Sequence, residues 1–212
     1  MLNKISASPT ALARPRDFIA GLAVGLMIPY CLKAATGLLR WLSMAGSYQE
    51  IDPVVLNLQS TSTWINLGFW RDTDVYREAC AGLANLLGQM ARIDASDAVL
   101  DVGCGCGDQL LLWREKFVPR SIVGVNIAAS EVDRARRLLG IHSIPEEQVR
   151  VLQADAVDLP FGDQAFDVVL SLDSAYHYKT REQFMREASR CLVDGGRLAL
   201  GDICLRAPIE SW

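Results

Sequence analysis

The chain has 212 residues, half of them hydrophobic, which suits one globular domain of ordinary core size with an additional segment. Its formal net charge of −4 is not that of a typical nucleic-acid-binding protein, so no nucleic-acid partner is expected. The six cysteines are scattered, and the pair Cys104 and Cys106 lacks a second Cys or His pair at a zinc-like spacing. We therefore expect neither a disulfide framework nor a metal site, and a reducing, cytoplasmic environment.

The first 45 residues differ in composition from the rest, which predicts a segment at 1–45 and a globular domain at 46–212. Within this segment, an uncharged apolar run over residues 18–32 resumes after one lysine and reaches residue 39. The first part of the run would form a helix about 22 Å long, whereas a membrane span needs about 20 residues. Four interpretations stay open. We favour a membrane-anchoring or interfacial helix over 18–39 that faces the cytosol; the others are a packed helix, an organelle transit peptide and a cleaved secretory signal.

Amphipathic helices alternate with short apolar strands along the globular part. Apolar residues recur at helical spacing in four segments: 72–93, 108–117, 130–140 and 180–196. Apolar runs bounded by turn residues predict five strands: 98–102, 121–127, 149–155, 166–172 and 197–203. This alternation predicts a doubly wound, mostly parallel α/β sheet whose ligands bind at the carboxyl ends of the strands.

Cap residues refine the expected helix ends. Ser130 is followed three residues later by Asp133, as in a capping box, and Thr180 is followed in the same way by Gln183. The pair Gly195–Gly196 is expected to end the last helix.

Three glycines at alternate positions come shortly after Asp101, at the end of the first predicted strand. A dinucleotide-binding turn has the spacing G-x-G-x-x-G, but its third glycine would fall on Asp108, where an acid would repel a pyrophosphate. Gly103, Gly105 and Gly107 instead give G-x-G-x-G, which lets the backbone closely approach a ligand without phosphates. A tight turn without a ligand is the alternative.

The stretch VLDVGCGCG and the segments after it resemble the motifs of class I S-adenosylmethionine-dependent methyltransferases of the small-molecule type, over roughly residues 46–205. The resemblance implies a Rossmann-like methyltransferase fold with S-adenosylmethionine as its cofactor. It also implies that Asp101 helps to hold the methionine end of the cofactor, bordered by Gly103, Gly105 and Gly107.

Further stretches resemble the family's other cofactor motifs. IVGVNI resembles the second strand, where the family usually has an acid for the ribose hydroxyls and this chain has Asn126, followed by Ile127. An amide can also accept from and donate to hydroxyls. LQADAVDLPF resembles the adenine motif, in which Asp155 would accept from the adenine amino group and the Ala156 backbone would contact the ring. WINLGFW, residues 64–70, resembles the segment that closes over the cofactor, with plain packing as the alternative.

The stretch FDVVLSLDSAYHY resembles the fourth strand and the turn that faces the reacting centre. The resemblance implies that His177 is the general base and that Asp202 orients or polarises it, and Tyr176 is a candidate for substrate contact. In the alternative, His177 only forms hydrogen bonds within its loop or lines the cofactor pocket. His142, the other histidine, is expected to be a surface or structural residue. O-methylation is favoured, while N- and C-methylation stay open.

The sheet of this family usually has seven strands, but the chain ends ten residues after Asp202. We expect the last two strands to be lacking. The alternatives are a truncated gene product, one half of a split protein, and a chain whose sheet is completed by a second copy or another partner. The predicted function is methyl transfer from S-adenosylmethionine to a small, lipophilic acceptor. The alternatives are a non-catalytic cofactor-binding or scaffold protein derived from a methyltransferase, and an NAD-type oxidoreductase.

Overall fold

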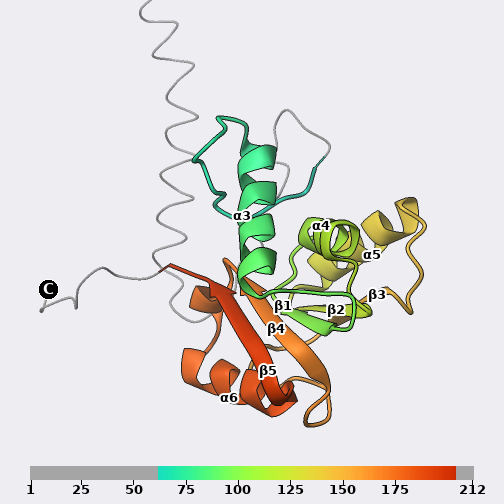
Figure 1. Cartoon of the computed structure of the whole chain (residues 1–212), viewed down its shortest axis with the longest axis vertical. Helices are drawn as coiled ribbons and strands as arrows, with labels where there is room; N and C mark the ends of the chain where they lie inside the picture. The colour runs from blue at the N-terminus through green and yellow to red at the C-terminus, as the bar shows by residue number, and fades with distance from the viewer. Residues whose placement is uncertain (1–61, 204–212) are drawn as a thin grey trace, which may run out of the picture. The chain divides into compact units, whose positions relative to one another are not determined.

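Residues 62–203 are described by the computed structural model shown in Figure 1. The expectations for the apolar run over 18–39 and for a boundary after residue 45 lie outside these residues. Within 62–203, no helix has the length and apolar character needed to cross a membrane.

The described part alternates helices and strands from its start to its end. The helices are α3 (Tyr76–Met90), α4 (Asp108–Phe117), α5 (Ala129–Ile141), the short 3₁₀ helix η1 (Ala175–His177) and α6 (Arg181–Cys191). The strands are β1 (Ala98–Val102), β2 (Ser121–Asn126), β3 (Val149–Gln153), β4 (Phe166–Leu172) and β5 (Leu192–Gly201).

The five strands form one parallel sheet in the order β3-β2-β1-β4-β5. The chain runs outward from β1 to β3, then returns to pair β4 with the free side of β1. The strand order therefore reverses between β1 and β4, which is where open α/β sheets bind their ligands. The predicted doubly wound, Rossmann-like fold is confirmed.

Apolar side chains on the two faces of the sheet form two separate cores. Alternate residues of a strand point to opposite faces, so Val99 and Leu100 of β1 belong to different clusters. The first cluster includes buried residues of α3, α4 and α5, and the second includes buried residues of α6. Figure 1 shows α6 apart from the other three helices, in agreement with a sheet that is covered on both faces.

Two of the expected helix ends are wrong, and one is confirmed. Helix α5 starts at Ala129 with Ala128 as its N-cap, so Ser130 is already helical and cannot form the predicted capping box with Asp133. Thr180 does cap α6, because its Oγ1 accepts from the backbone N–H of Gln183 at 3.1 Å.

The glycine pair after α6 belongs to a strand and not to a helix cap. Helix α6 ends at Cys191, and β5 begins with the next residue, Leu192. The pairing of β4 with β5 is irregular between Phe166 and Val168, opposite this part of β5. Gly195 has a φ of +76° there, so the glycines form a kinked part of the strand.

Candidate active site

The turn between β1 and α4 requires glycine for two reasons. All three of its glycines have a positive φ, between +54° and +94°, which side chains rarely adopt. A Cβ atom on any of them would also lie within 3 Å of another side chain of this protein. The glycines, each with the residue that its Cβ would meet first, are Gly103 with Ser174, Gly105 with Ile65, and Gly107 with Ala135. The glycines thus let three other segments pack against the turn, a role that the sequence did not reveal.

Asp101 at the carboxyl end of β1 is fully buried and only half satisfied. Its Oδ2 accepts from Nε2 of Gln109 at 2.7 Å, whereas its Oδ1 has no hydrogen-bond partner. Burial raises the pKa of Asp101 to about 7, against the opposing effect of the Gln109 hydrogen bond. A buried acceptor without a partner costs about 1–3 kcal/mol, so a ligand that brings a donor would be stabilised here.

The end of β2 holds a buried polar pair of which the sequence predicted only one member. Asn126 is buried, and its Nδ2 donates to Oε2 of Glu131 in the first turn of α5. Glu131 is also fully buried. The expected family acid is therefore absent from the strand, but a carboxylate from the next helix lies beside Asn126. Ile127 is partly exposed, and its backbone carbonyl accepts from the Gln153 side chain.

The loop after β3 carries the two expected adenine-binding residues. Asp155 is partly buried, and its Oδ1 accepts from the backbone N–H of Val157 at 3.1 Å. Ala156 is buried against the second core cluster. This loop and the ends of β1 and β2 lie at the same edge of the sheet, because all three strands are parallel.

The turn after β4 places His177 among two carboxylates and an aromatic ring. His177 ends η1, and its ring centroid lies 4.2 Å from that of Tyr176. Burial lowers the pKa of His177, while the nearby charges of Asp173 and Asp202 act in the opposite direction. Asp202 also forms an ion pair with Arg181 at 3.0 Å. Its carboxylate therefore interacts with the Arg181 cation as well as with His177.

Tyr178 anchors this turn to β1, which the sequence did not predict. Its hydroxyl donates to the backbone carbonyl of Val102 at 2.7 Å and lies 2.9 Å and 3.0 Å from the hydroxyls of Ser171 and Ser174. Burial raises the pKa of Tyr178, so the hydroxyl stays protonated as a donor. The end of β1, where the glycine turn begins, and the loop of His177 are thereby joined.

The segment before α3 lies against both of these turns. The backbone N–H of Leu67 donates to Oδ2 of Asp173 at 2.6 Å, and Thr63 donates to the carboxylate of Asp108 through its backbone and its hydroxyl. Asp108 therefore has a partner within the protein. Leu67 and Trp70 are about half exposed. The prediction that residues 64–70 close over a cofactor stays a prediction.

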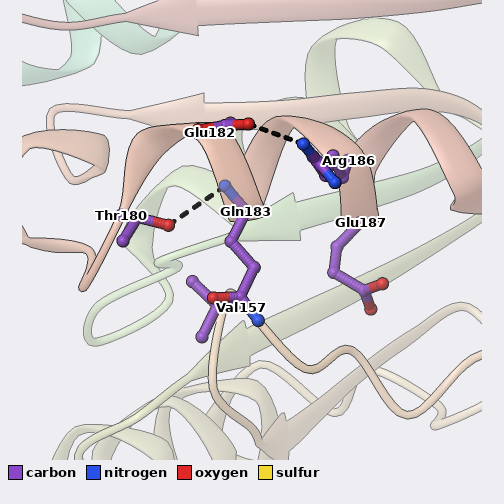
Figure 2. A pocket seen from close by; sticks show the side chains of 6 residues that line it. All are labelled: Val157, Thr180, Glu182, Gln183, Arg186 and Glu187. Carbon is purple, nitrogen blue, oxygen red and sulfur yellow. Dashed lines mark hydrogen bonds and ion pairs between the residues drawn. The ribbon is translucent and has the colours of Figure 1, made fainter.

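An open groove of about 420 Å³ lies beside this edge of the sheet, along α6 (Figure 2). Its walls include Val157 from the loop after β3, but none of the expected cofactor ligands. Glu182 and Arg186 on its helical side form an ion pair at 2.6 Å. The groove thus neighbours the candidate site without being part of it.

The sequence of this chain is similar to those of known methyltransferases. Residues 100–200 match a family described as a methyltransferase domain. The chain is 41% identical over 141 residues to the erythromycin 3''-O-methyltransferase of Saccharopolyspora erythraea, covering 66% of this chain and 46% of that protein. It is 35% identical over 139 residues to the 27-O-demethylrifamycin SV methyltransferase of Amycolatopsis mediterranei, covering 65% and 50%.

A solved structure shares the fold as well. The crystal structure of the [4+2]-cyclase SpnF superposes with a TM-score of 0.63 at 26% identity, covering 70% of this chain and 56% of that one. The chain spans about half the length of the curated relatives it matches.

Proposed function

The chain belongs to the class I S-adenosylmethionine-dependent methyltransferases, and we propose that it transfers the methyl group of this cofactor to a hydroxyl oxygen of a small molecule. The observation that carries the proposal is the buried, half-satisfied carboxylate of Asp101 beside the glycine turn, at the point where the strand order reverses. The O-methyltransferases among its relatives support oxygen as the methylated atom.

The residues around Asp101 fit the cofactor chemically. The unpaired Oδ1 of Asp101 would accept from the ammonium group of the methionine part, which brings both a positive charge and N–H donors. Asn126 and the adjacent Glu131 would hold the ribose hydroxyls, and Ile127 would flank them. Asp155 would accept from the adenine amino group beside the Ala156 backbone. When bound, the cofactor supplies an electrophilic methyl group on a sulfonium.

His177 is the proposed general base. It would accept the proton of the acceptor hydroxyl on a ring nitrogen as the oxygen gains the methyl group, with the sulfur–methyl bond broken and the sulfur leaving as a neutral thioether. Because burial lowers its pKa, the imidazole is neutral and able to accept a proton near pH 7. Asp173 and Asp202 would stabilise the imidazolium that results, and Tyr176 would contact the acceptor.

The acceptor is proposed to be lipophilic because apolar side chains stand exposed next to this turn. Leu67, Phe69 and Trp70 belong to the segment that Asp173 holds. We also propose a membrane contact through residues 18–39 and a cytoplasmic location.

A cofactor-binding protein without methyl transfer is the second candidate. One observation favours it: a chain with this fold, SpnF, is described as a cyclase. An NAD-type oxidoreductase is less well supported, because Asp108 and its Thr63 partner occupy the place of the third glycine of a dinucleotide turn.

Calorimetric titration of the full-length protein with S-adenosylmethionine and with NADH tests the cofactor assignment. We expect binding of the first ligand only. Mass spectrometry would then detect methylation in a panel of hydroxylated lipophilic compounds. The His177→Gln variant should lose at least about 100-fold in kcat, whereas His142→Gln, at an exposed histidine, should match the parent protein. Binding without any methylated product would favour the second candidate, and binding of NADH alone would overturn the proposal.

A further inference from the structure

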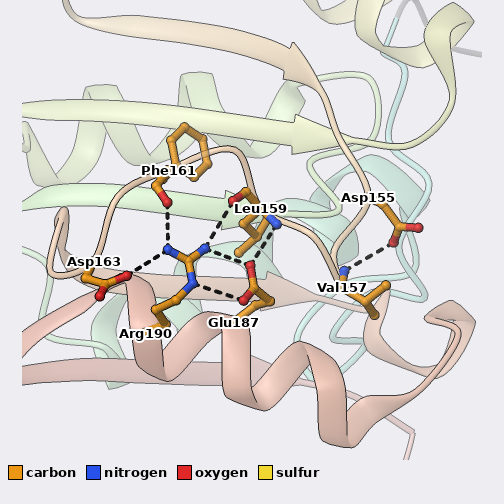
Figure 3. A network of polar contacts seen from close by, with 7 residues as sticks. All are labelled: Asp155, Val157, Leu159, Phe161, Asp163, Glu187 and Arg190. Atoms are coloured by element: carbon orange, nitrogen blue, oxygen red, sulfur yellow. Dashed lines mark hydrogen bonds and ion pairs between the residues drawn. The ribbon is translucent and has the colours of Figure 1, made fainter.

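An ion pair on α6 holds the loop that follows β3 (Figure 3). Arg190 donates through Nε and NH2 to the two carboxylate oxygens of Glu187, at 3.0 Å and 2.7 Å. The pair is partly shielded from solvent, since the side chains of Glu187 and Arg190 are 19% and 31% exposed. This differs from the pair Glu182–Arg186 on the same helix, in which both side chains are more than three-quarters exposed.

The ion pair binds the backbone of the loop at three points. Oε2 of Glu187 accepts from the N–H of Leu159 at 2.9 Å. Arg190 donates through NH2 to the carbonyl of Leu159 at 3.1 Å and through NH1 to the carbonyl of Phe161 at 2.6 Å. Arg190 also forms an ion pair with Asp163 at 3.1 Å. These are charge-assisted hydrogen bonds, which are stronger than bonds between neutral groups.

The bound residues come directly after the expected adenine ligands. Asp155 and Ala156 are followed by a tight turn, in which Asp155 accepts from the N–H groups of Val157 and Asp158. Leu159, which both members of the ion pair bind, is the next residue and is buried. The turn is thus fixed at one end by β3 and at the other by α6.

We propose that Glu187 and Arg190 are positioning residues that hold residues 155–159 in the shape in which Asp155 and Ala156 recognise the adenine ring. The inference rests on the proposed cofactor function. Neither side chain needs to touch the cofactor. They act through the backbone of Leu159, and a shift of the loop by about 1 Å is enough to spoil a geometry of this kind.

The test compares two ligands that differ only at the amino-bearing edge of the purine ring. S-adenosylhomocysteine has the amino group beside an unprotonated N1, whereas S-inosylhomocysteine has a carbonyl beside a protonated N1. Calorimetry on the full-length protein gives the dissociation constant of each. The parent protein should prefer the adenosyl ligand. In Arg190→Gln and Glu187→Gln, the affinity for the adenosyl ligand should fall about tenfold while that for the inosyl ligand changes little.

Matched variants separate positioning from general stability. Arg186→Gln removes the exposed ion pair on the same helix and should leave both affinities unchanged. Arg190→Lys keeps the charge and should restore part of the preference, and it serves if Arg190→Gln fails to fold. Amide hydrogen exchange should speed up over residues 155–163 in Arg190→Gln and stay unchanged in Arg186→Gln.

Each remaining outcome counts against the inference. An unchanged preference in the Gln variants, even with a lower melting temperature, would show a purely structural role. Equal affinity of the parent protein for both ligands would overturn the inference and leave the cofactor assignment standing. Absence of binding of either ligand to the parent protein would overturn both.

Discussion

At the scale of single residues, Asp101 connects the stability of the fold to its ligand. An aspartate that is fully buried with one unpaired oxygen is costly when ionised, and its pKa is raised to about 7. The unfolded chain ionises the same group near pH 4. Between these two values the native state holds a proton that the unfolded state releases, so the contribution of Asp101 to stability falls as pH rises.

Asp101→Asn should remove this pH dependence. The amide oxygen can still accept from Gln109, and no charge is buried at any pH. Relative to the parent protein, we expect the free energy of unfolding of the variant to increase from pH 4.5 to pH 7.5, by about 4 kcal/mol at most. Urea unfolding across this range measures it. A difference between the two proteins that stays constant with pH would contradict the raised pKa.

Gly103 is the residue at which the turn tolerates substitution least. Its φ of +81° is unfavourable for alanine, and an added Cβ would lie 1.9 Å from Oγ of Ser174 and 2.8 Å from the Tyr178 hydroxyl. We expect Gly103→Ala to cost at least about 2 kcal/mol in the free energy of unfolding. Gly140, whose added Cβ would meet nothing within 4 Å, offers the control, and Gly140→Ala should be neutral or slightly stabilising. Equal effects of both substitutions in a urea titration would show that packing at the turn is unimportant.

At the scale of elements, the connection from β4 to α6 is attached to β1 by one hydroxyl. Tyr178→Phe keeps the ring, which packs edge-on against Phe184, and removes the hydrogen bond to Val102. We expect a loss of about 1–2 kcal/mol in stability. Because the same turn carries His177, kcat should fall and its pH profile should shift, while the KM for S-adenosylmethionine changes little. A change in stability without any change in kcat would mean that the bond does not position His177.

The order and type of the elements could be predicted from the sequence because each has its own local pattern. The apolar runs and helical spacings are complete within each segment, and they predict all five strands and all four long helices of residues 62–203. The wrong boundaries depend on contacts beyond the segment. Ser130 is a typical cap residue, but the N-cap of α5 is Ala128, two residues earlier, and Gly195 is kinked within a strand that pairs with β4.

The candidate site likewise has features that the local sequence predicts and features that depend on contacts between distant segments. The glycine turn and Asp101 follow one another in the sequence, so their pattern could be recognised. The role of Glu131 depends on α5, which places it against Asn126, and that of Tyr178 depends on a bond to Val102, 76 positions earlier, so neither role follows from the local sequence. The family pattern, which implied an acid at the end of the second strand, gave no reason to look for it on the following helix.

At the scale of the whole described domain, the candidate site is assembled from segments that only the fold brings together. Five segments each contribute a residue or a hydrogen bond: the turn after β1, the end of β2, the loop after β3, the turn after β4 and the segment before α3. A ligand that binds all of them should stabilise the native state as a unit. At a concentration of 100 times its dissociation constant, such a ligand adds about 2.7 kcal/mol.

S-adenosylhomocysteine at that concentration should therefore raise the melting temperature of the full-length protein by about 5–10 °C. NADH at the same concentration should leave it unchanged, because the turn after β1 presents Asp108 where a pyrophosphate would lie. In Asp101→Asn, the shift with S-adenosylhomocysteine should become smaller, since the ammonium group of the ligand would lose the carboxylate partner that we propose for it. Differential scanning fluorimetry compares these three measurements directly. A full shift in the Asp101→Asn variant would mean that the ligand is held elsewhere, and the segments around Asp101 would then form only the structural centre of the sheet.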